Sequence, residues 1–280
     1  MNPLGLVRVS VADVHRAPDQ RSEQVTQAIM GTAVTILDRR GEKWLQVQLP
    51  DGYKGWIHGG LLQLGDEMLV HRWTREAGLL ITVPWAMIYS KRTLRSDPIS
   101  DVVIGTKLRL VKESPRWLRV GLPDDRQGWL ARRATTRGAH LIHPEDGNRQ
   151  DILRMARRFL GLPYLWGGLS PKGFDCSGFT QTVFGLNGYR LPRDAYQQYR
   201  CGQAISSRED LAAADLLFFQ GSGADRITHV AIHLSGEQFI HCSDFVKINS
   251  LSSLASDYDA SLEQHYVGAR RIVGGKNGAC

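Results

Sequence analysis

The sequence has few cysteines, and they are spaced too widely for a metal site or a disulfide framework. Four occur in 280 residues, at positions 176, 201, 242 and 280, and no two form a C-x-x-C pair. Neither a structural zinc site nor a disulfide scaffold is therefore expected. No base accompanies Cys201, Cys242 or Cys280 in the sequence, so we expect these three to be chemically passive.

Long apolar runs are also missing. No stretch approaches the ~20 apolar residues of a membrane-spanning helix, so a membrane partner is not expected. The first residues, from Met1 to Arg8, lack the basic segment and the ~7–15 apolar residues of a secretory signal. If Met1 is the native start, a cytoplasmic location is expected. A secreted chain trimmed of its leader would read the same way.

Charge of one sign is in modest excess. Lys and Arg number 35 against 28 Asp and Glu, a net charge of +7, and 42% of the residues are hydrophobic, as in ordinary globular proteins. Such an excess is compatible with nucleic acid, an anionic wall polymer or simply a soluble surface. We interpret the basic residues as scattered. Because no recognition motif accompanies them, a nucleic-acid partner is not expected.

One small unit occurs twice in the first half of the chain. The first copy reads G-T-A-V-T-I-L from Gly31, then K-W-L-Q-V, L-P-D and G-W-I; the second reads G-T-K-L-R-L-V from Gly105, then R-W-L-R-V, L-P-D and G-W-L. Short alternating runs between Gly, Pro and Asp turns predict a small β-barrel for each copy. We expect the tryptophans to pack in or beside the barrel cores, in preference to binding a ligand.

The last third of the chain turns to helical periodicity. One broad apolar face predicts a helix from Asn148 that ends at Gly161 and Pro163. The residues of that face are Ile152, Leu153, Met155, Ala156, Phe159 and Leu160. The polar, turn-rich stretch before this helix places a domain boundary near residue 138.

A second helix is predicted from Ser177 to Phe184, with Cys176 at its start. The unpaired N–H groups and the positive dipole end of a helix N-terminus favour thiolate over thiol. Cys176 is therefore a candidate nucleophile. The alternative is a buried structural cysteine, because free cysteine is among the most buried residue types.

Two histidines lie in apolar segments that flank the turn signal S-G-E at 235–237. A hairpin with its turn near residues 235 and 236 would place His229 directly opposite His241 on one face of the sheet. His233 shares that face but lies at the turn end. The pair supplies a base and a group to orient it, and together with Cys176 it forms a predicted catalytic triad.

Residues 148–273 resemble the NlpC/p60 family of papain-like cell-wall peptidases. The motifs P-Y-L-W-G-G, D-C-S-G-F, L-P-R-D-A-Y-Q-Q, D-L-L-F-F, T-H-V-A-I and F-I-H-C-S follow one another in the family's order. The resemblance implies Cys176 as nucleophile, His229 as base, His241 as the residue that orients it, and Tyr164 as a hydroxyl that stabilises the oxyanion. It also implies amide hydrolysis through an acyl enzyme, with no metal and no cofactor. The A-A-D at 213–215 departs from the family's usual P-G-D, at a turn.

The repeats resemble bacterial SH3-like domains over most of residues 1–138. Tandem units ahead of an NlpC/p60 domain narrow the resemblance to γ-D-glutamyl-L-diamino acid endopeptidases, which act on L-Ala-γ-D-Glu-diamino acid peptides with a free N-terminal L-Ala. In these enzymes a carboxylate pairs with the substrate ammonium, and Asp194 matches it. The other predicted substrate contacts are Ser177, Arg193, Trp166 and, from the first barrel, Glu23 and Tyr53. A structural ion pair is the alternative for Arg193.

These features predict an α+β chain in three domains. SH3-like barrels are expected at 1–66 and 67–138, and a papain-like NlpC/p60 domain at 139–280. The predicted function is cleavage of free murein peptides during cell-wall recycling by a monomeric enzyme. Two alternatives remain open: a secreted autolysin that acts on intact wall, and a wall-binding protein with little hydrolysis. The sequence does not distinguish diaminopimelate from lysine in the substrate.

Overall fold

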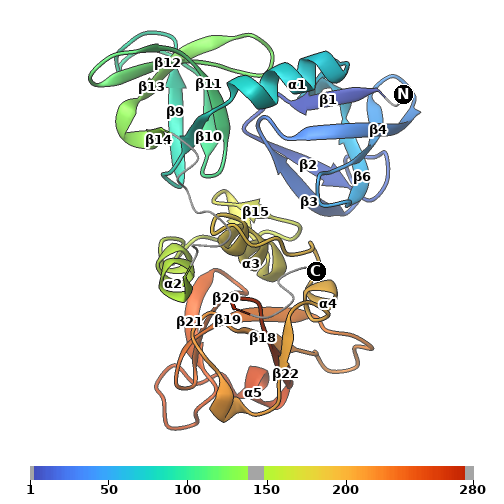
Figure 1. The fold of residues 1–280 in the computed structure, drawn as a ribbon. Coiled ribbons are helices and arrows are strands. Elements are labelled where there is room, and N and C mark those ends of the chain that lie inside the picture. The colour runs from blue at the N-terminus through green and yellow to red at the C-terminus, as the bar shows by residue number, and fades with distance from the viewer. Residues whose placement is uncertain (1–2, 138–147, 275–280) are drawn as a thin grey trace. The chain divides into compact units, whose positions relative to one another are not determined.

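The computed structural model describes residues 3–137 and 148–274, and the chain divides into two compact units, residues 1–140 and 141–280 (Figure 1). The boundary expected near residue 138 falls outside the described residues. In the part of the chain that is described, no helix is long and apolar enough to cross a membrane.

The first unit starts with a seven-stranded antiparallel sheet in the order β3-β2-β6-β5-β4-β1-β7. Its strands alternate as the sequence predicts: in β5, Leu45 and Val47 are buried while Trp44, Gln46 and their neighbour Gln48 are only half-buried. The strands are β1 (Leu4–Val7), β2 (Val11–His15), β3 (Gln24–Ile29), β4 (Ala33–Arg40), β5 (Trp44–Gln48), β6 (Lys54–His58) and β7 (Leu62–Gly65).

The second sheet repeats the first, strand for strand. Its order is β10-β9-β13-β12-β11-β8-β14, so each strand occupies the place of its counterpart seven strands earlier. The strands are β8 (Leu79–Ile81), β9 (Trp85–Tyr89), β10 (Pro98–Val103), β11 (Lys107–Glu113), β12 (Trp117–Gly121), β13 (Gln127–Ala131) and β14 (Thr135–Arg137). The internal repeat of the sequence is thus a repeat of topology.

The helix α1 (Glu67–Glu76) joins the two barrels into one unit. Asp66 caps its first turn, and its Trp73 is buried in a cluster that also contains Leu6 and Met30 of the first barrel and the core of the second. Gly31 has a positive φ of 83° and lies against Trp73, where an added Cβ would come within 2.8 Å of the indole nitrogen. The two barrels therefore share a hydrophobic core and do not form separate folding units.

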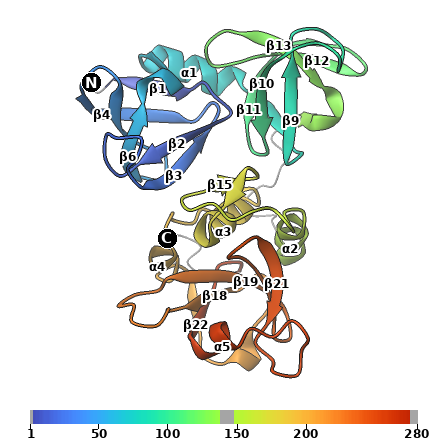
Figure 2. The ribbon, with the colours of Figure 1, turned by 180° about the vertical axis from the view of Figure 1, so that it is seen from behind.

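The second unit is built on a six-stranded antiparallel sheet in the order β17-β22-β18-β19-β20-β21, with α2 and α3 on one side of it (Figure 2). Its strands are β17 (Gln203–Ile205), β18 (Leu216–Phe219), β19 (His229–Ser235), β20 (Gln238–Cys242), β21 (Val246–Ser250) and β22 (Tyr266–Arg271), with a small β15 (Leu169–Ser170) and β16 (Gly173–Phe174) hairpin outside the sheet. Its helices are α2 (Arg149–Arg157), α3 (Cys176–Gly185), α4 (Ala195–Gln198) and α5 (Ala260–Gln264).

The two helices predicted for this unit form where the sequence places them. Asn148 caps α2, and the apolar face is buried except for Leu160, which is 43% exposed because it lies beyond the last turn. Asp175 caps α3 and Cys176 is its first residue, as expected. Helix α3 packs on β19 and β20, and this contact brings the cysteine to the histidine hairpin.

The start of α3 depends on a glycine. A Cβ at Gly178 would collide with the carbonyl oxygen of Gly168 and lie 3.0 Å from Oδ1 of Asp175. Because the first obstacle is backbone, no side-chain rotation relieves it. The glycines of the G-G and C-S-G motifs thus allow the loop and the helix to approach each other.

We expect Gly178→Ala to lower the free energy of unfolding by about 2–3 kcal/mol, because overpacking forces backbone to shift. Chemical denaturation of the two proteins measures the difference. Gly185→Ala, at the other end of α3, is the matched control: its Cβ would meet nothing within 4 Å, so the better helix propensity of Ala should leave stability unchanged or raise it. Equal effects at both positions would contradict the close approach.

Candidate active site

The thiol of Cys176 lies at the junction of α3 and β19. Its side chain is buried, and Sγ is 3.9 Å from the carbonyl oxygen of Thr228, the residue that precedes His229. The backbone N–H groups of Ser177 and Val230 also interact with the sulfur. The nucleophile predicted from the sequence and the predicted base are thus neighbours in space, although 52 residues separate Cys176 from Thr228 in the chain.

The two histidines meet on one face of the sheet, but their register differs from the prediction. The expected direct pairing of His229 with His241 is wrong: Ile232 pairs with Ile240 and His233 with Phe239, and a bulge follows before the turn. The shift is two residues, so both side chains keep the same face and lie diagonally. Nε2 of His229 is 2.8 Å from Nδ1 of His241.

A hydrogen-bond chain continues from His241 to the main chain. Nε2 of His241 lies 3.0 Å from Oδ1 of Asn249, and the amide nitrogen of Asn249 donates to the carbonyl oxygen of Asp257 at 3.0 Å. A carbonyl can only accept, so the amide of Asn249 has its nitrogen toward Asp257 and its oxygen toward the imidazole. His241 then carries its proton on Nε2, and its Nδ1 is an acceptor.

This chain assigns the tautomer of His229. Because Nδ1 of His241 accepts, Nε2 of His229 donates, and Nδ1 of His229 is left with a lone pair. That is the nitrogen available to take a proton from a thiol. Sequence reasoning missed Asn249: it is one polar residue in a strand of alternating pattern, with no motif to mark it.

Burial keeps both histidines neutral. It lowers the pKa of His229 to about 3, with the neighbouring His241 and Lys247 acting in the same direction. It lowers the pKa of His241 to about 4, although the hydrogen bond that His241 donates to Asn249 acts in the opposite direction. The two rings therefore remain uncharged, as the assigned donor and acceptor roles require, through the neutral range of pH.

The expectation that the helix N-terminus favours a thiolate at Cys176 does not hold for this structure. Burial and the Asp175 carboxylate raise the pKa of the thiol to about 12, outweighing the N–H groups of Val230 and Ser177 and the charge of Arg193. The resting site is thus a neutral thiol beside a neutral imidazole. The nucleophile has to be formed by proton transfer as it reacts.

Asp175 is a functional residue that the sequence reasoning did not single out. One carboxylate oxygen accepts from the N–H of Gly178 at 2.7 Å and from Nη1 of Arg193 at 3.0 Å, and the other accepts from the N–H of Gly167 at 2.9 Å and pairs with Nη2 of Arg193. Arg193 also donates to Oγ of Ser177 at 2.9 Å. This network holds the start of α3 in place.

Its geometry bears on two of the predicted substrate contacts. Arg193 is 2% exposed and Ser177 is 6% exposed, and both Nη atoms of Arg193 and Oγ of Ser177 are engaged with Asp175 or with each other. Substrate contact by these side chains stays a prediction. For Arg193, the structural ion pair that was the alternative is what the structure contains.

The other predicted residues of this unit lie at more open positions. Tyr164 is half-buried, and burial together with Cys176 and Asp175 raises its pKa, so its hydroxyl keeps its proton and can donate. Trp166 is 61% exposed. Asp194 is half-buried and caps α4, with its N–H donating to Oε1 of Gln197 at 3.2 Å.

Glu23 and Tyr53 belong to the first unit. Glu23 forms an ion pair with Arg16 at 2.7 Å, and Tyr53 packs partly buried against the core of the first barrel. Their contribution to a substrate pocket stays a prediction.

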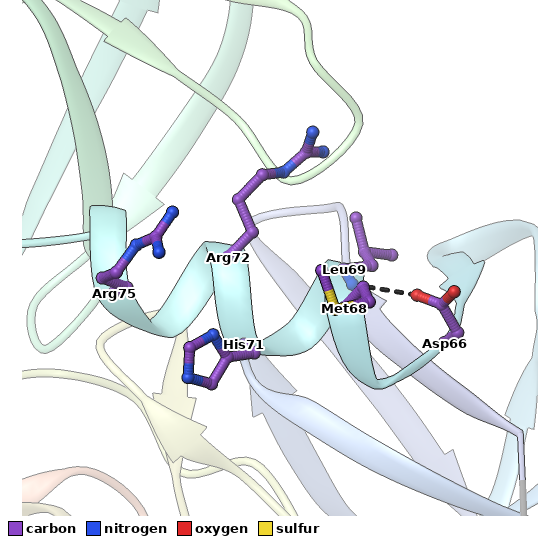
Figure 3. A pocket seen from close by; sticks show the side chains of 6 residues that line it. All are labelled: Asp66, Met68, Leu69, His71, Arg72 and Arg75. Atoms are coloured by element: carbon purple, nitrogen blue, oxygen red, sulfur yellow. Dashed lines mark hydrogen bonds between the residues drawn. The ribbon is translucent and has the colours of Figure 1, made fainter.

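The structure describes a pocket of about 360 Å³ on α1 of the same unit (Figure 3). It is lined by Asp66, Met68, Leu69, His71, Arg72 and Arg75, and none of these is a predicted site residue.

Neither Cys242 nor His233 belongs to the triad, and Cys201 is disulfide-bonded and offers no free thiol. Cys242 is buried, and its thiol donates to the carbonyl oxygen of Phe174 at 3.2 Å; burial raises its pKa to about 12. His233 is buried, with its ring nitrogens 2.9 Å from the carbonyl oxygens of Ala212 and Gly236. Across residues 3–137 and 148–274, no cluster of three or more His, Cys, Asp or Glu residues is arranged to hold a metal ion.

The low pKa of the histidine pair predicts a dependence of stability on pH. In the unfolded chain both titrate near 6.5, so between that pH and about 4 the unfolded state binds protons that the folded site excludes. The contribution of the two histidines to the free energy of unfolding is fully present above pH 6.5. Below that pH it falls by about 1 kcal/mol per pH unit for each histidine. The free energy of unfolding, measured by urea denaturation at several pH values from 4.5 to 7, should therefore change less steeply with pH for His241→Asn than for the wild type. Equal slopes would mean that folded His241 takes up its proton as readily as the unfolded chain does.

The chain is similar to known proteins over most of its length. The model of the NlpC/P60 family matches residues 161–271, and that of the bacterial dipeptidyl-peptidase Sh3 domain matches residues 14–59. Relatives named gamma-D-glutamyl-L-lysine dipeptidyl-peptidase occur in Bacillus cereus (32% identity over 89% of this chain and 75% of the relative) and Bacillus subtilis (32% identity, 77% and 71%). The crystal structure of an NlpC/P60 family protein from Bacillus cereus is 28% identical with a TM-score of 0.80, covering 96% of this chain and 99% of that one. This chain therefore belongs to the NlpC/P60 family of cysteine peptidases.

Proposed function

We propose that this hydrolase cleaves the γ-D-Glu–L-diamino acid bond of murein peptides that carry a free N-terminal L-Ala. The observation that carries the proposal is the chain from Cys176 through His229, His241 and Asn249, which supplies a thiol and an oriented base for amide hydrolysis. The names of the relatives support the γ-D-glutamyl specificity. The diamino acid is diaminopimelate or lysine.

The proposed reaction starts from the neutral pair. Nδ1 of His229 takes the proton of the Cys176 thiol while sulfur attacks the amide carbonyl carbon. The backbone N–H of Cys176 and the hydroxyl of Tyr164 stabilise the oxyanion. His229 then passes its proton to the leaving amine of the diamino acid, and the γ-glutamyl thioester remains on the enzyme.

Deacylation uses the same two proton transfers, with water as the nucleophile and the sulfur of Cys176 as the leaving group. His229 takes a proton from water as the oxygen attacks the thioester carbonyl carbon, and it returns that proton to the departing sulfur. The products are a peptide with a new carboxylate and the regenerated thiol. His241 and Asn249 act as positioning residues throughout, because they leave the lone pair on Nδ1 of His229, the nitrogen proposed to take the proton of the thiol.

The proposed selectivity depends on charge. The ammonium of a free L-Ala requires a partner charge once it leaves water, and Asp194 is the proposed partner. An acylated L-Ala, as in a stem still joined to its glycan, has no positive charge for that carboxylate to attract. This favours a role in peptide recycling, with a cytoplasmic location, over an autolysin that acts on intact wall or a wall binder with little hydrolysis.

A comparison of two substrates tests the proposal. We expect L-Ala-γ-D-Glu-meso-diaminopimelate to be cleaved at least 100-fold more efficiently than its N-acetylated form, by kcat/KM, because only the first carries the ammonium. Asp194→Asn should remove most of this preference. Asn is as good an N-cap as Asp, so the variant keeps the start of α4 and changes only the charge.

The controls separate the reaction from its selectivity. Cys176→Ala should abolish cleavage of both substrates. Cleavage of both at equal rates by the wild type would refute the free-amine requirement and leave the peptidase chemistry standing. Absence of cleavage by a folded wild type would refute the proposed function itself.

The role of Asn249 predicts a pH signature. Asn249→Leu removes the acceptor that fixes the tautomer of His241, and we expect kcat to fall about 100-fold with KM little changed. Asn249→Asp keeps an acceptor but adds a charge that raises the pKa of His241. A protonated His241 donates from Nδ1 and forces His229 into the wrong tautomer, so the acid limb of the kcat–pH profile should move up by about 1 unit. A residue with only a structural role would lower stability in both variants without moving this limb.

A further inference from the structure

The positive charge of the chain is concentrated in one domain. Residues 67–138 contain 14 Lys and Arg against 7 Asp and Glu, whereas residues 1–66 contain 7 against 7 and residues 139–280 contain 14 against 14. The whole net charge of +7 therefore belongs to α1 and the second barrel. The interpretation of the basic residues as scattered does not hold once they are grouped by domain.

Most of this charge is not neutralised within the second barrel. Arg72, Arg75, Arg109, Arg126 and Arg132 each form an ion pair with a carboxylate of the same region. Eight further cations are exposed, and within the described residues none of them forms an ion pair. These are Lys91, Arg92, Arg95, Lys107, Lys112, Arg116, Arg119 and Arg133.

Two of the eight line up with aromatic residues in a row across the sheet. Lys112 of β11 pairs with Arg119 of β12, Arg119 pairs with Trp129 of β13, and Trp129 pairs with Tyr89 of β9. Directly paired residues point to the same side, so these four side chains form one strip on the outer face. We call it the cationic row.

Aromatic and cationic side chains extend the cationic row at its edges. The guanidinium of Arg92 lies over the ring of Trp129, 5.5 Å from its centroid. Trp117, two residues before Arg119 on the same face, contacts Tyr89 edge to face with centroids 6.1 Å apart. Trp129 and Trp117 are half-buried, so part of each ring is open.

The first barrel contains the same row with different residues. Asp38 pairs with Gln46, Gln46 with Trp56, and Trp56 with His15, on the strands that correspond in order. The tryptophan is kept, but an acid and an amide stand where the second barrel has Lys112 and Arg119. The barrel fold therefore does not require cations in these places.

The Lys112–Arg119 pair has a cost for folding. Like charges directly opposite on neighbouring strands repel each other and destabilise a sheet. No carboxylate within the described residues pairs with either one. An anionic ligand on the cationic row would relieve this repulsion.

We propose that the cationic row binds an acidic glycan, a sugar chain with a negative charge in its repeating unit. Guanidinium and ammonium groups bind carboxylates or phosphates. The open parts of Trp129 and Trp117 offer apolar surface to the C–H faces of the sugar rings. This function is separate from the proposed peptidase activity, because the cationic row contains none of the residues assigned to that reaction or to its substrate.

The arrangement of the rings favours a sugar chain over single-stranded nucleic acid. Successive bases stack on open, flat aromatic faces. Here Tyr89 and Trp117 are at 87° to each other, and Arg92 covers one face of Trp129. A sugar requires only a small apolar contact beside each charge.

Binding to polygalacturonate tests the proposal, with the full chain as the protein and dextran and a 20-nucleotide oligo-dT as comparisons. We expect binding to polygalacturonate that weakens steeply from 50 to 200 mM salt, no binding to dextran, and weaker binding to oligo-dT at equal salt. The double substitution Lys112→Gln and Arg119→Gln should weaken polygalacturonate binding at least 10-fold. It should also raise Tm at low salt, because the repulsion is removed.

The matched control removes the same charge elsewhere in the barrel. Lys107→Gln with Arg133→Gln eliminates two exposed, unpaired cations outside the cationic row, and we expect less than a 2-fold loss of binding. Equal losses in the two double variants would reduce the effect to non-specific electrostatics and overturn the site. Tighter binding of oligo-dT, or no binding of polygalacturonate, would overturn the ligand assignment. Peptidase activity on the short murein peptide should be the same in both variants, so this test and that of the proposed function fail separately.

Discussion

The buried carboxylate of Asp175 organises the catalytic unit. It caps α3, accepts the N–H of Gly167 from the loop that carries Tyr164 and Trp166, and holds the buried guanidinium of Arg193. An uncompensated charge at this depth would cost several kcal/mol, and removal of one partner of a buried pair typically costs about 3–5 kcal/mol. The helix that presents Cys176, the loop before it and the segment that leads to Asp194 are therefore fixed to one another by a single side chain.

The same carboxylate affects the chemistry of its neighbour. It stands one residue before the nucleophile and, with burial, keeps the thiol protonated at rest. The site therefore combines a rigid scaffold with a nucleophile that is inactive until its proton is transferred. A protonated thiol is a weak nucleophile, so the resting enzyme reacts slowly with electrophiles other than its substrate.

Much of this molecule could be predicted from the sequence, and the failures have physical causes. Local signals sufficed for both repeats, for α2 and α3, and for the face shared by His229 and His241. The register of the hairpin was wrong by two residues because a bulge near Ser235 has no sequence signature. Asn249 and the identity of Asp175 as the partner of Arg193 escaped, because they depend on contacts between distant segments. The state of the thiol was misjudged because a helix terminus is visible in the sequence and burial is not.

The hydrogen-bond chain behind His229 ends on a main-chain carbonyl, that of Asp257, and not on a carboxylate. Every member of that relay is therefore electrically neutral, and its last member has no proton to gain or lose. Positive charge that forms on the imidazole has no fixed counter-ion within the relay, so it is balanced by the negative charge on sulfur and then on the oxyanion. Charge separation in the proposed reaction is thus confined to His229 and the reacting atoms, and it lasts only while His229 carries the transferred proton.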